Sequence, residues 1–454
     1  MPNLFEHGHG EKRCLKKEYI MNSETLYRVV LDQQDELAIL SGKDFVHRNE
    51  TELISPDSKL AQVVIGVRRS GKSTLCHIAL RKAGVKYGYV NFDDDRLGKL
   101  KMEDLNLVLE AIYRVYGTEV QHLFFDEIQN VEGWHLFVNR LLRQGLHLLI
   151  TGSNARLLSS ELSTHLTGRY HEIKLYPFSF REFCIANGID TDKPTTKHIA
   201  LLKNTLNRYL IEGGFPELGR LSLPERHTYV SGLIDTIVTK DIAARFHIRN
   251  IAGLKVLAQH LINHAGQFVN LNELTDTLGI GTDKTIRLYL DYLTQAFLIL
   301  PLTKFSYKSG DRLRNSKAYI VDTGILTYRP DVLSPENLGW RLENAVLLEL
   351  QRRNAPLRRD VFYYRPTSRA HEVDFVVAEQ GQIRELIQVA YDISQPKTLS
   401  RELTALAEAS GKTGCKHLTL VAGSESRKEK VGGIEVSIVS ATEWLLADSV
   451  QSPA

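Results

Sequence analysis

The sequence predicts a multidomain α/β protein with a parallel sheet in its first large domain and a smaller α/β unit at its end. Three observations predict this. Short apolar runs alternate with helical patterns from residue 60 to about 183, which is typical of a parallel sheet covered by helices. The next segment is helical in period to about residue 310, and strand–helix alternation then returns. The 454 residues suffice for about three domains at roughly 150 residues each.

Composition excludes several classes of protein. The chain has 57 Lys and Arg against 54 Asp and Glu, a net charge of +3, which is unlike a histone-like or polyacidic chain. The longest apolar run, Ala296 to Leu302, has seven residues and contains a proline, whereas a membrane-spanning helix needs about 20 apolar residues. The amino-terminal residues lack the apolar core of a signal peptide. The four cysteines are scattered, so we expect reduced thiols in a soluble, cytoplasmic protein.

A glycine-rich loop lies between the first apolar strand, AQVVI, and the helix TLCHIAL. Its sequence, GVRRSGKS, matches G-x-x-x-x-G-K-[ST] in the context that this phosphate-binding motif requires. Backbone N–H groups of such a loop wrap phosphate, and the helix amino terminus adds positive potential. Lys72 is expected to reach the β- and γ-phosphates, and the Ser73 hydroxyl to bind Mg²⁺. The predicted ATP-binding residues are Gly66, Val67, Arg68, Arg69, Ser70, Gly71, Lys72, Ser73 and Thr74.

A second apolar strand, HLFF, ends in two adjacent carboxylates, Asp126 and Glu127. In P-loop ATPases the first acid of such a pair holds Mg²⁺, and the second polarises the attacking water. A pair of this kind carries little weight alone, but here it follows the P-loop by one strand–helix unit. We therefore assign Asp126 to the metal and Glu127 to the water.

Two weaker signals follow. The strand HLLITG is followed by Ser153 and Asn154, either of which fits a residue that senses the γ-phosphate, although an ordinary capping serine fits equally well. Arg169, in the sequence TGR, fits an arginine that neutralises the transferring phosphoryl group. An arginine in a turn is also a common surface residue, so both interpretations stay open.

Together these residues resemble the AAA-type ATPases of bacteria and archaea, specifically a branch with a C-terminal domain of unknown function. The resemblance extends over nearly all of the chain beyond residue 50, through GVRRSGKST, FFDEIQNVEGW, LITGSNARLL, LTGRYHEIKLYPFSFREF, GGFPE, KAYIVDTGIL, ENAVLLEL and HEVDFVV. It implies ATP binding, with hydrolysis. It also favours Arg169 as a phosphate-sensing or finger arginine, acting in cis or from a neighbouring subunit of a homo-oligomer, and Ser153 or Asn154 as the sensor.

Three helix candidates between Leu254 and Ala296, followed by the apolar stretch FLILPLTKF, describe a winged helix-turn-helix. On the third helix Lys284 and Arg287 are the cations that face DNA in this interpretation, but two aspartates cancel their charge. A winged helix used for packing or protein contact fits as well. Basic clusters at 304–317 and 352–369 are suited to a nucleic-acid backbone, although solvated surface is the more common explanation of a charge run.

The last part of the chain resembles a restriction-endonuclease-like core. Asp374 fits the first metal-binding position of such a core, but Gln388 and Ala390 stand where active members have an acid and a lysine. This loss weakens metal binding and removes the group that orients water. Glu343 and Glu372 are partial substitutes at most. We therefore expect a domain that binds DNA or a partner rather than a nuclease, and a structural role for Asp374 remains an alternative.

The leading functional hypothesis is an ATP-driven switch that acts with DNA. The alternatives are an ATP-binding protein-interaction scaffold with little turnover and, with less support, an ATP-dependent nuclease. The expected parts are an N-terminal helical extension (1–52), a P-loop AAA-type ATPase core (53–190), a helical lid or linker (191–250), a winged-helix-like module (251–310) and a restriction-endonuclease-like domain (311–454).

Overall fold

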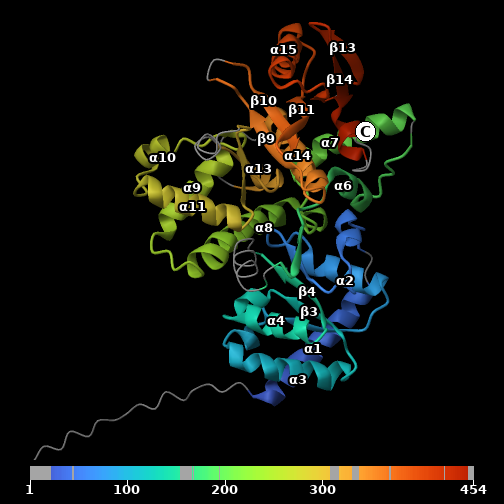
Figure 1. The fold of residues 1–454 in the computed structure, drawn as a ribbon, viewed down its shortest axis with the longest axis vertical. Helices are drawn as coiled ribbons and strands as arrows, with labels where there is room; N and C mark the ends of the chain where they lie inside the picture. Colours follow the sequence, from blue (N-terminus) through green and yellow to red (C-terminus); the bar gives the residue numbers. More distant parts are fainter. Residues whose placement is uncertain are drawn as a thin grey trace, which may run out of the picture.

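Two larger β-sheets, one near each end of an elongated molecule, organise the structure (Figure 1). Helices α9, α10 and α11 lie to one side between them. The structure is a computed structural model. It describes residues 22–42, 45–153, 166, 168–193, 195–306, 316–329, 337–367, 370–423 and 425–447.

The first sheet has five strands in the order β2-β3-β4-β1-β5, and every neighbouring pair is parallel. All five residues of β1 are buried, as expected of a strand covered by helices on both faces. The predicted α/β fold class is confirmed. The strands are β1 (Ala61–Ile65), β2 (Tyr87–Asn91), β3 (His122–Asp126), β4 (His147–Gly152) and β5 (Tyr170–Lys174), and the helices are α2 (Lys72–Lys82), α3 (Leu105–Tyr116) and α4 (Trp134–Arg143).

The amino-terminal helix α1 (Ser23–Ser41) packs against α3 and β2 of this first unit. Asn22 caps it by accepting a hydrogen bond from Glu24 N, and its Leu26, Val29 and Val30 are buried in the core. The described part of the predicted extension is therefore attached to the first domain, because its apolar stripe is covered by that domain.

A helical segment follows the first sheet and ends in a π-helix, η6 (Ile237–Ala244). A π-helix is rare and is found frequently at functional sites. The segment also contains α6 (Phe180–Ala186), α7 (Thr196–Glu212), η5 (Leu218–Arg220) and α8 (Leu223–Thr236).

Three helices and a small antiparallel sheet in the order β6-β8-β7 form the next module. Gly279 begins the turn between its second and third helices with φ +59°, a left-handed conformation that glycine adopts at little cost. Its elements are α9 (Ile251–Asn263), β6 (Gln267–Phe268), α10 (Leu271–Leu278), α11 (Asp283–Gln295), β7 (Ile299–Thr303) and β8 (Ser316–Ile320).

The C-terminal sheet has six strands in the order β13-β14-β12-β11-β10-β9. Its centre, β11-β12-β14, is parallel, and its flanking pairs are antiparallel, so it forms the expected second α/β unit. The elements are α13 (Gly324–Tyr328), α14 (Leu338–Asn354), β9 (Asp360–Tyr364), β10 (Val373–Glu379), β11 (Gln382–Ala390), α15 (Pro396–Thr413), β12 (Leu418–Ala422), β13 (Arg427–Val431), β14 (Ile434–Ser440) and α16 (Ala441–Leu446).

Two distant glycine-containing sequences, GGFPE and VDTG, meet in the interior. The buried Asp322 carboxylate accepts hydrogen bonds from Gly214 N at 2.6 Å and Gly324 N at 2.9 Å. A Cβ atom at Gly213 would lie 2.0 Å from Asp322 Oδ1, and one at Gly324 would lie 2.4 Å from Glu212 O. Only glycine allows this approach, so the contact fixes the helical segment to the strand that leads into the C-terminal domain.

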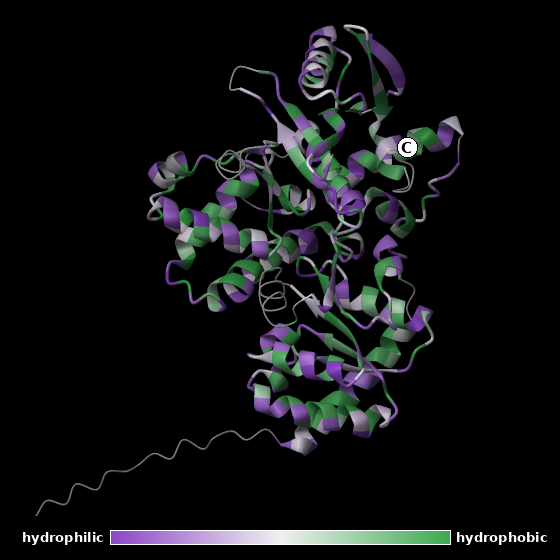
Figure 2. Ribbon diagram, viewed as in Figure 1, coloured by the Kyte–Doolittle hydropathy of each residue, from purple (hydrophilic) through white to green (hydrophobic). Residues whose placement is uncertain are grey.

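Hydrophobic residues concentrate in the strands of both sheets, while hydrophilic residues are frequent on the outer helices (Figure 2). Among the described residues, no helix combines the length and the apolar character needed to cross a bilayer.

The buried His77 on α2 gives a stability prediction. Burial, assisted by Arg81, lowers the pKa of His77 to about 4, below the unfolded value of about 6.5. The unfolded chain therefore binds this proton first, so the contribution of His77 to stability is complete above pH 6.5 and is lost as pH falls toward 4. The free energy of unfolding of the wild type should fall by about 3 kcal/mol across this range because of His77, and His77→Gln should not show this fall. Urea unfolding of both proteins at several pH values measures it, and parallel stability–pH curves would contradict it.

Candidate functional site

The P-loop connects β1 to α2 at the carboxyl edge of the first sheet. Gly71, just before the helix, has φ +96°, and a Cβ atom at Gly66 would lie 2.1 Å from the carbonyl oxygen of Leu175. Glycine is therefore required at the first position by close packing and favoured at the second by backbone conformation. Both motif glycines have a structural reason, and the loop faces the edge where parallel α/β sheets bind ligands.

Lys72 lies within this loop, and its side chain is 5% exposed. Its Nζ donates to the carbonyl oxygens of Gly66 at 3.2 Å and Val67 at 3.3 Å. The same ammonium is 3.5 Å from Glu127 Oε1. The structure therefore brings together the P-loop lysine and the second acid, which are far apart in sequence.

The two acids at the end of β3 lie in different environments. Burial, together with the neighbouring Glu127, raises the pKa of Asp126 to about 6, although hydrogen bonds from Thr151 and Ser73 oppose this shift. Burial alone would raise the pKa of Glu127, but Lys72 and other donors lower it overall. Glu127 is therefore ionised at neutral pH. Its backbone is left-handed, with φ +54°, so the chain leaves the direction of β3 at this residue.

The end of β4 supplies a residue that sequence reasoning missed. The Thr151 hydroxyl donates to Asp126 Oδ1 and accepts a 3.1 Å hydrogen bond from Glu127 N. The predicted Ser153 is buried, and its backbone N–H donates to Glu127 Oε2 at 3.2 Å. A hydroxyl within an otherwise apolar strand is the sequence signal for Thr151.

The residues present fit a nucleotide phosphate with Mg²⁺. The buried Ser70 Oγ has no hydrogen-bond partner among the described residues, as expected of a polar group that a phosphate oxygen can satisfy. The Ser73 hydroxyl and the Asp126 carboxylate offer hard oxygen donors, which Mg²⁺ prefers. These two residues would hold the ion.

A buried arginine that is not among the predicted site residues, Arg48, contacts the P-loop. Arg48 donates to Ser70 O at 3.2 Å, to Tyr176 O at 2.7 Å and to Glu182 Oε1 at 2.7 Å. Its guanidinium also lies 5.1 Å from the Phe178 ring centroid. Nothing in the local sequence indicates this role, because the partners come from the P-loop, from α6 and from the segment between β5 and α6.

Both P-loop arginines contact the helical segment. Arg68 forms a bidentate pair with Asp241 of the π-helix, at 2.9 and 3.0 Å, and Arg69 lies 3.0 Å from Glu217. Arg68 also contacts Asp93, which pairs with Lys240 at 2.8 Å. The predicted binding loop is thus tied to residues that follow the first domain.

The remaining site candidates are not brought to the loop. Asn154 and Thr167 lie outside the described residues. Arg169 is exposed, and β5 pairs with β1 in the register Ala61↔Tyr170, so Arg169 lies at the amino end of β1. The P-loop follows the opposite end, a strand length of roughly 17 Å away. Parallel pairing therefore separates Arg169 from the Lys72 of its own chain.

Of the cationic residues predicted to bind nucleic acid, some pair with other residues inside the protein and others are exposed. Arg352 donates to Pro177 O and pairs with Glu349, and Arg353 donates to Trp444 O and also pairs with Glu349. These two arginines hold the structure together and are not a free phosphate-binding surface, which corrects that part of the 352–369 cluster. Lys284 and Arg287 are exposed on α11, while Tyr307, Lys308, Asp311, Arg312, Arg314 and Arg369 lie outside the described residues.

A second cavity, of about 600 Å³, lies in the C-terminal domain and is lined by Glu343, Glu372, Asp374 and Gln388, among others. Lys317 from β8 reaches these carboxylates, 2.5 Å from Glu372 and 3.3 Å from Glu343. Gln388 donates to Glu402 at 2.7 Å, and burial raises the pKa of Asp374 well above its usual range. A lysine is thus present near Asp374, but it comes from β8 and not from the strand that carries Gln388 and Ala390.

The sequence is similar to three family models and to proteins of other organisms. Residues 58–184 match a family model described as an AAA domain, and residues 203–336 and 338–442 match two domains of unknown function, DUF8612 and DUF4143. An uncharacterized protein of Methanocaldococcus jannaschii is 33% identical over 406 residues, covering 87% of this chain and 88% of the relative. An uncharacterized protein of Haemophilus influenzae is 32% identical over 406 residues, covering 86% and 95%.

Among solved structures, similarity is distant. A Walker-type ATPase of Pyrococcus abyssi is 15% identical, with 63% of this chain and 96% of that chain covered and a TM-score of 0.40. The RuvB Holliday junction branch migration motor of Thermotoga maritima is 18% identical, with 61% and 93% covered and a TM-score of 0.26. From its sequence relatives, the chain belongs to the family that includes the uncharacterized Methanocaldococcus jannaschii and Haemophilus influenzae proteins, and it carries an AAA domain with the P-loop ATPase fold.

Proposed function

We propose that this protein is a Mg²⁺-dependent ATPase that acts as a nucleotide-driven switch with DNA as its target. The observation that carries the ATPase proposal is the contact between Lys72 and Glu127, 3.5 Å apart, beside Asp126 at the edge where the P-loop lies. Phosphate binding, metal binding and water activation need a cation, an oxygen-donor set and an ionised base at one place, and these residues supply them.

Each residue has a distinct proposed role. Lys72 contacts the β- and γ-phosphates, Ser73 and Asp126 hold the metal ion, and Glu127 accepts a proton from the attacking water. Bound Mg²⁺ supplies neutralisation of phosphate charge. Glu127 suits its role because its lowered pKa keeps the carboxylate ionised, and Thr151 and the Ser153 N–H fix its position. Ser153 or Asn154 acts as the sensor.

The switch proposal is supported by contacts that lead away from the loop. Arg68 and Arg69 reach Asp241 and Glu217 in the helical segment. Gly214 of that segment donates to Asp322, beside the C-terminal domain. The phosphate of bound ATP would compete with Asp241 and Glu217 for these arginines, and its contacts would differ before and after hydrolysis. A difference in contacts of this kind shifts a conformational equilibrium.

DNA is proposed as the target because the element order α9, β6, α10, α11, β7 and β8 supports a winged helix, in which α11 would be the recognition helix. The aspartates of α11 are engaged internally, Asp283 by Thr275 and Asp291 by Gln295. Lys284 and Arg287 remain exposed on the same helix. We further propose the domain boundaries predicted from the sequence, except that the winged-helix-like module extends past residue 310 to include β8, which pairs with β6 and β7. We also propose a homo-oligomer in which Arg169 acts on a neighbouring subunit.

The scaffold alternative predicts stable ATP occupancy with little turnover. The nuclease alternative is weakened by the ion pairs in the C-terminal cavity, because Glu343 and Glu372 already share Lys317 as an internal partner. We therefore propose that this domain keeps a restriction-endonuclease-like fold for binding DNA or a partner, as the sequence predicts, and does not cut DNA.

The test is steady-state ATP hydrolysis with and without double-stranded DNA. We expect DNA to increase turnover several-fold in the wild type, and the Lys284→Glu/Arg287→Glu variant to lose the increase while keeping basal turnover, because phosphate contacts depend on those cations. A matched control with the same change of charge is Lys412→Glu/Lys416→Glu, at exposed positions far along the chain. Turnover that ignores DNA would redirect the target to a protein, and absent turnover with tight ATP binding would favour the scaffold.

A further inference from the structure

Two histidines begin neighbouring parallel strands at the amino edge of the first sheet, opposite the P-loop. His122 is the first residue of β3 and His147 the first of β4, and they are paired in register. In-register residues of adjacent strands project to the same face of a sheet. Their rings accordingly stack, with centroids 4.7 Å apart and planes inclined by 19°.

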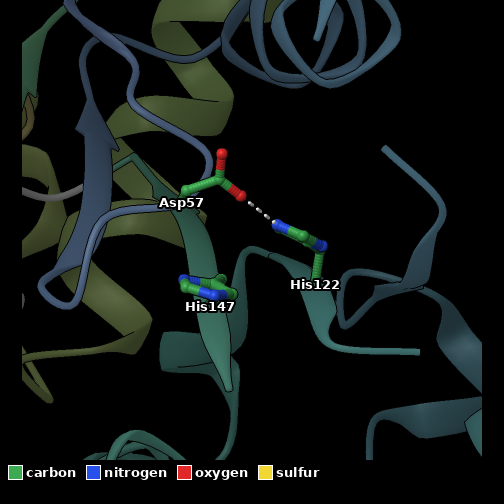
Figure 3. A group of neighbouring side chains, drawn as sticks. All are labelled: Asp57, His122 and His147. Carbon is green, nitrogen blue, oxygen red and sulfur yellow. Dashed lines mark hydrogen bonds and ion pairs between the residues drawn. The ribbon is translucent and has the colours of Figure 1, made fainter. Parts of the chain in front are cut away.

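Asp57, in the segment between η1 (Asn49–Leu53) and β1, completes the group (Figure 3). Its Oδ1 lies 3.0 Å from His122 Nε2. One donor atom from each of the three residues lies within 4.8 Å of the others. Two imidazoles and one carboxylate therefore converge from three segments that are far apart in sequence.

The site is oriented by its surroundings. His147 Nδ1 is 3.0 Å from the carbonyl oxygen of Ser58, and since a carbonyl only accepts, Nδ1 carries the hydrogen of the neutral ring. Nε2 then has the lone pair that a metal requires, and a backbone hydrogen bond of this kind is the usual outer support of a metal-binding histidine.

We propose that Asp57, His122 and His147 bind a divalent transition-metal ion, with Zn²⁺ as the best match. Two histidines and a carboxylate, with one position left for water, make a four-coordinate zinc site. Ligand atoms about 2.0–2.2 Å from zinc lie roughly 3.3–3.6 Å apart in a tetrahedron. The donor atoms, now within 4.8 Å of one another, must therefore close by about 1 Å, and the stacked rings must tilt so that the ion lies in both ring planes. The Asp57 side chain, 83% exposed on its loop, is free to move toward the rings. The ion would tie this loop to the sheet edge, independently of nucleotide.

A simple ion pair between Asp57 and His122 is the competing explanation, and it gives His147 no role. The decisive comparison is Zn²⁺ titration by calorimetry of the wild type, His122→Gln, His147→Gln and His171→Gln. His171 is the matched control, because it lies on β5 of the same sheet but hydrogen-bonds to Gln62. All proteins should carry His7→Ala, His9→Ala, Cys14→Ser and His165→Ala, which removes the histidine and cysteine donors outside the described residues, and Asp126→Asn, which removes an acid at the P-loop.

We expect one Zn²⁺ per chain in the parent and in His171→Gln, and at least ~10-fold weaker binding in His122→Gln and His147→Gln. Zn²⁺ should also raise the Tm of the parent, and chelation should reverse the rise. X-ray absorption of the loaded parent should report two imidazoles, which keeps the test valid if a variant folds poorly. Equal binding by parent and His147→Gln, or no saturable binding at micromolar Zn²⁺, would overturn the proposal.

Discussion

Glu127→Gln is expected to lower kcat for ATP hydrolysis by about 10²–10⁴-fold, the contribution typical of a positioned general base. The amide has the same size as the carboxylate but cannot accept the proton from water. ATP affinity should stay the same or increase, because Lys72 loses its anionic partner, now 3.5 Å away, and becomes more available to phosphate. Single-turnover hydrolysis and equilibrium binding of a fluorescent ATP analogue measure the two quantities separately.

Two further variants test whether the loss of kcat comes from the role of Glu127 as general base. Lys72→Ala should impair ATP binding itself, because it removes the phosphate-binding cation. Thr151→Val should lower kcat with little change in ATP affinity, because the hydroxyl is engaged by Asp126 and by the backbone of Glu127 and so positions both acids. Equal hydrolysis by wild type and Glu127→Gln would contradict the assignment of Glu127.

Local patterns account for what the sequence predicted correctly. The strands of the first sheet are short apolar runs, and the P-loop requires glycines in a local turn, so both are visible without long-range information. The acids Asp126 and Glu127 follow an apolar strand in the same way. Parallel strands end at one edge, which explains why these acids lie near Lys72.

Long-range contacts explain what was missed. Arg48 and Glu182 are 134 positions apart, and Lys317 reaches a cavity formed mainly by later residues, so neither role leaves a local signal. The position of Arg169, away from the P-loop of its own chain, has another reason. The strand register, which periodicity does not fix, places it at the amino end of β1.

The largest stability loss is expected for Arg48→Met. Arg48 and Glu182 side chains are both 5% exposed, and removing one partner of a buried ion pair costs about 3–5 kcal/mol because the other charge stays uncompensated. The variant also leaves the carbonyls of Ser70 and Tyr176 without their donors. Urea unfolding followed by circular dichroism measures the loss, and a change below about 1 kcal/mol would contradict the buried-pair assignment.

Arg48→Lys and the double variant Arg48→Met/Glu182→Gln separate charge from geometry. Lysine keeps the charge but lacks the planar fork that donates in three directions, so we expect an intermediate loss. The double variant should be more stable than Arg48→Met, because no buried charge is left unpaired. Full recovery is not expected, since Glu182 also caps α6 by accepting from Ser179 N at 2.8 Å. If Arg48→Lys binds ATP more weakly at nearly native stability, the contact with Ser70 O positions the P-loop as well as stabilising the fold.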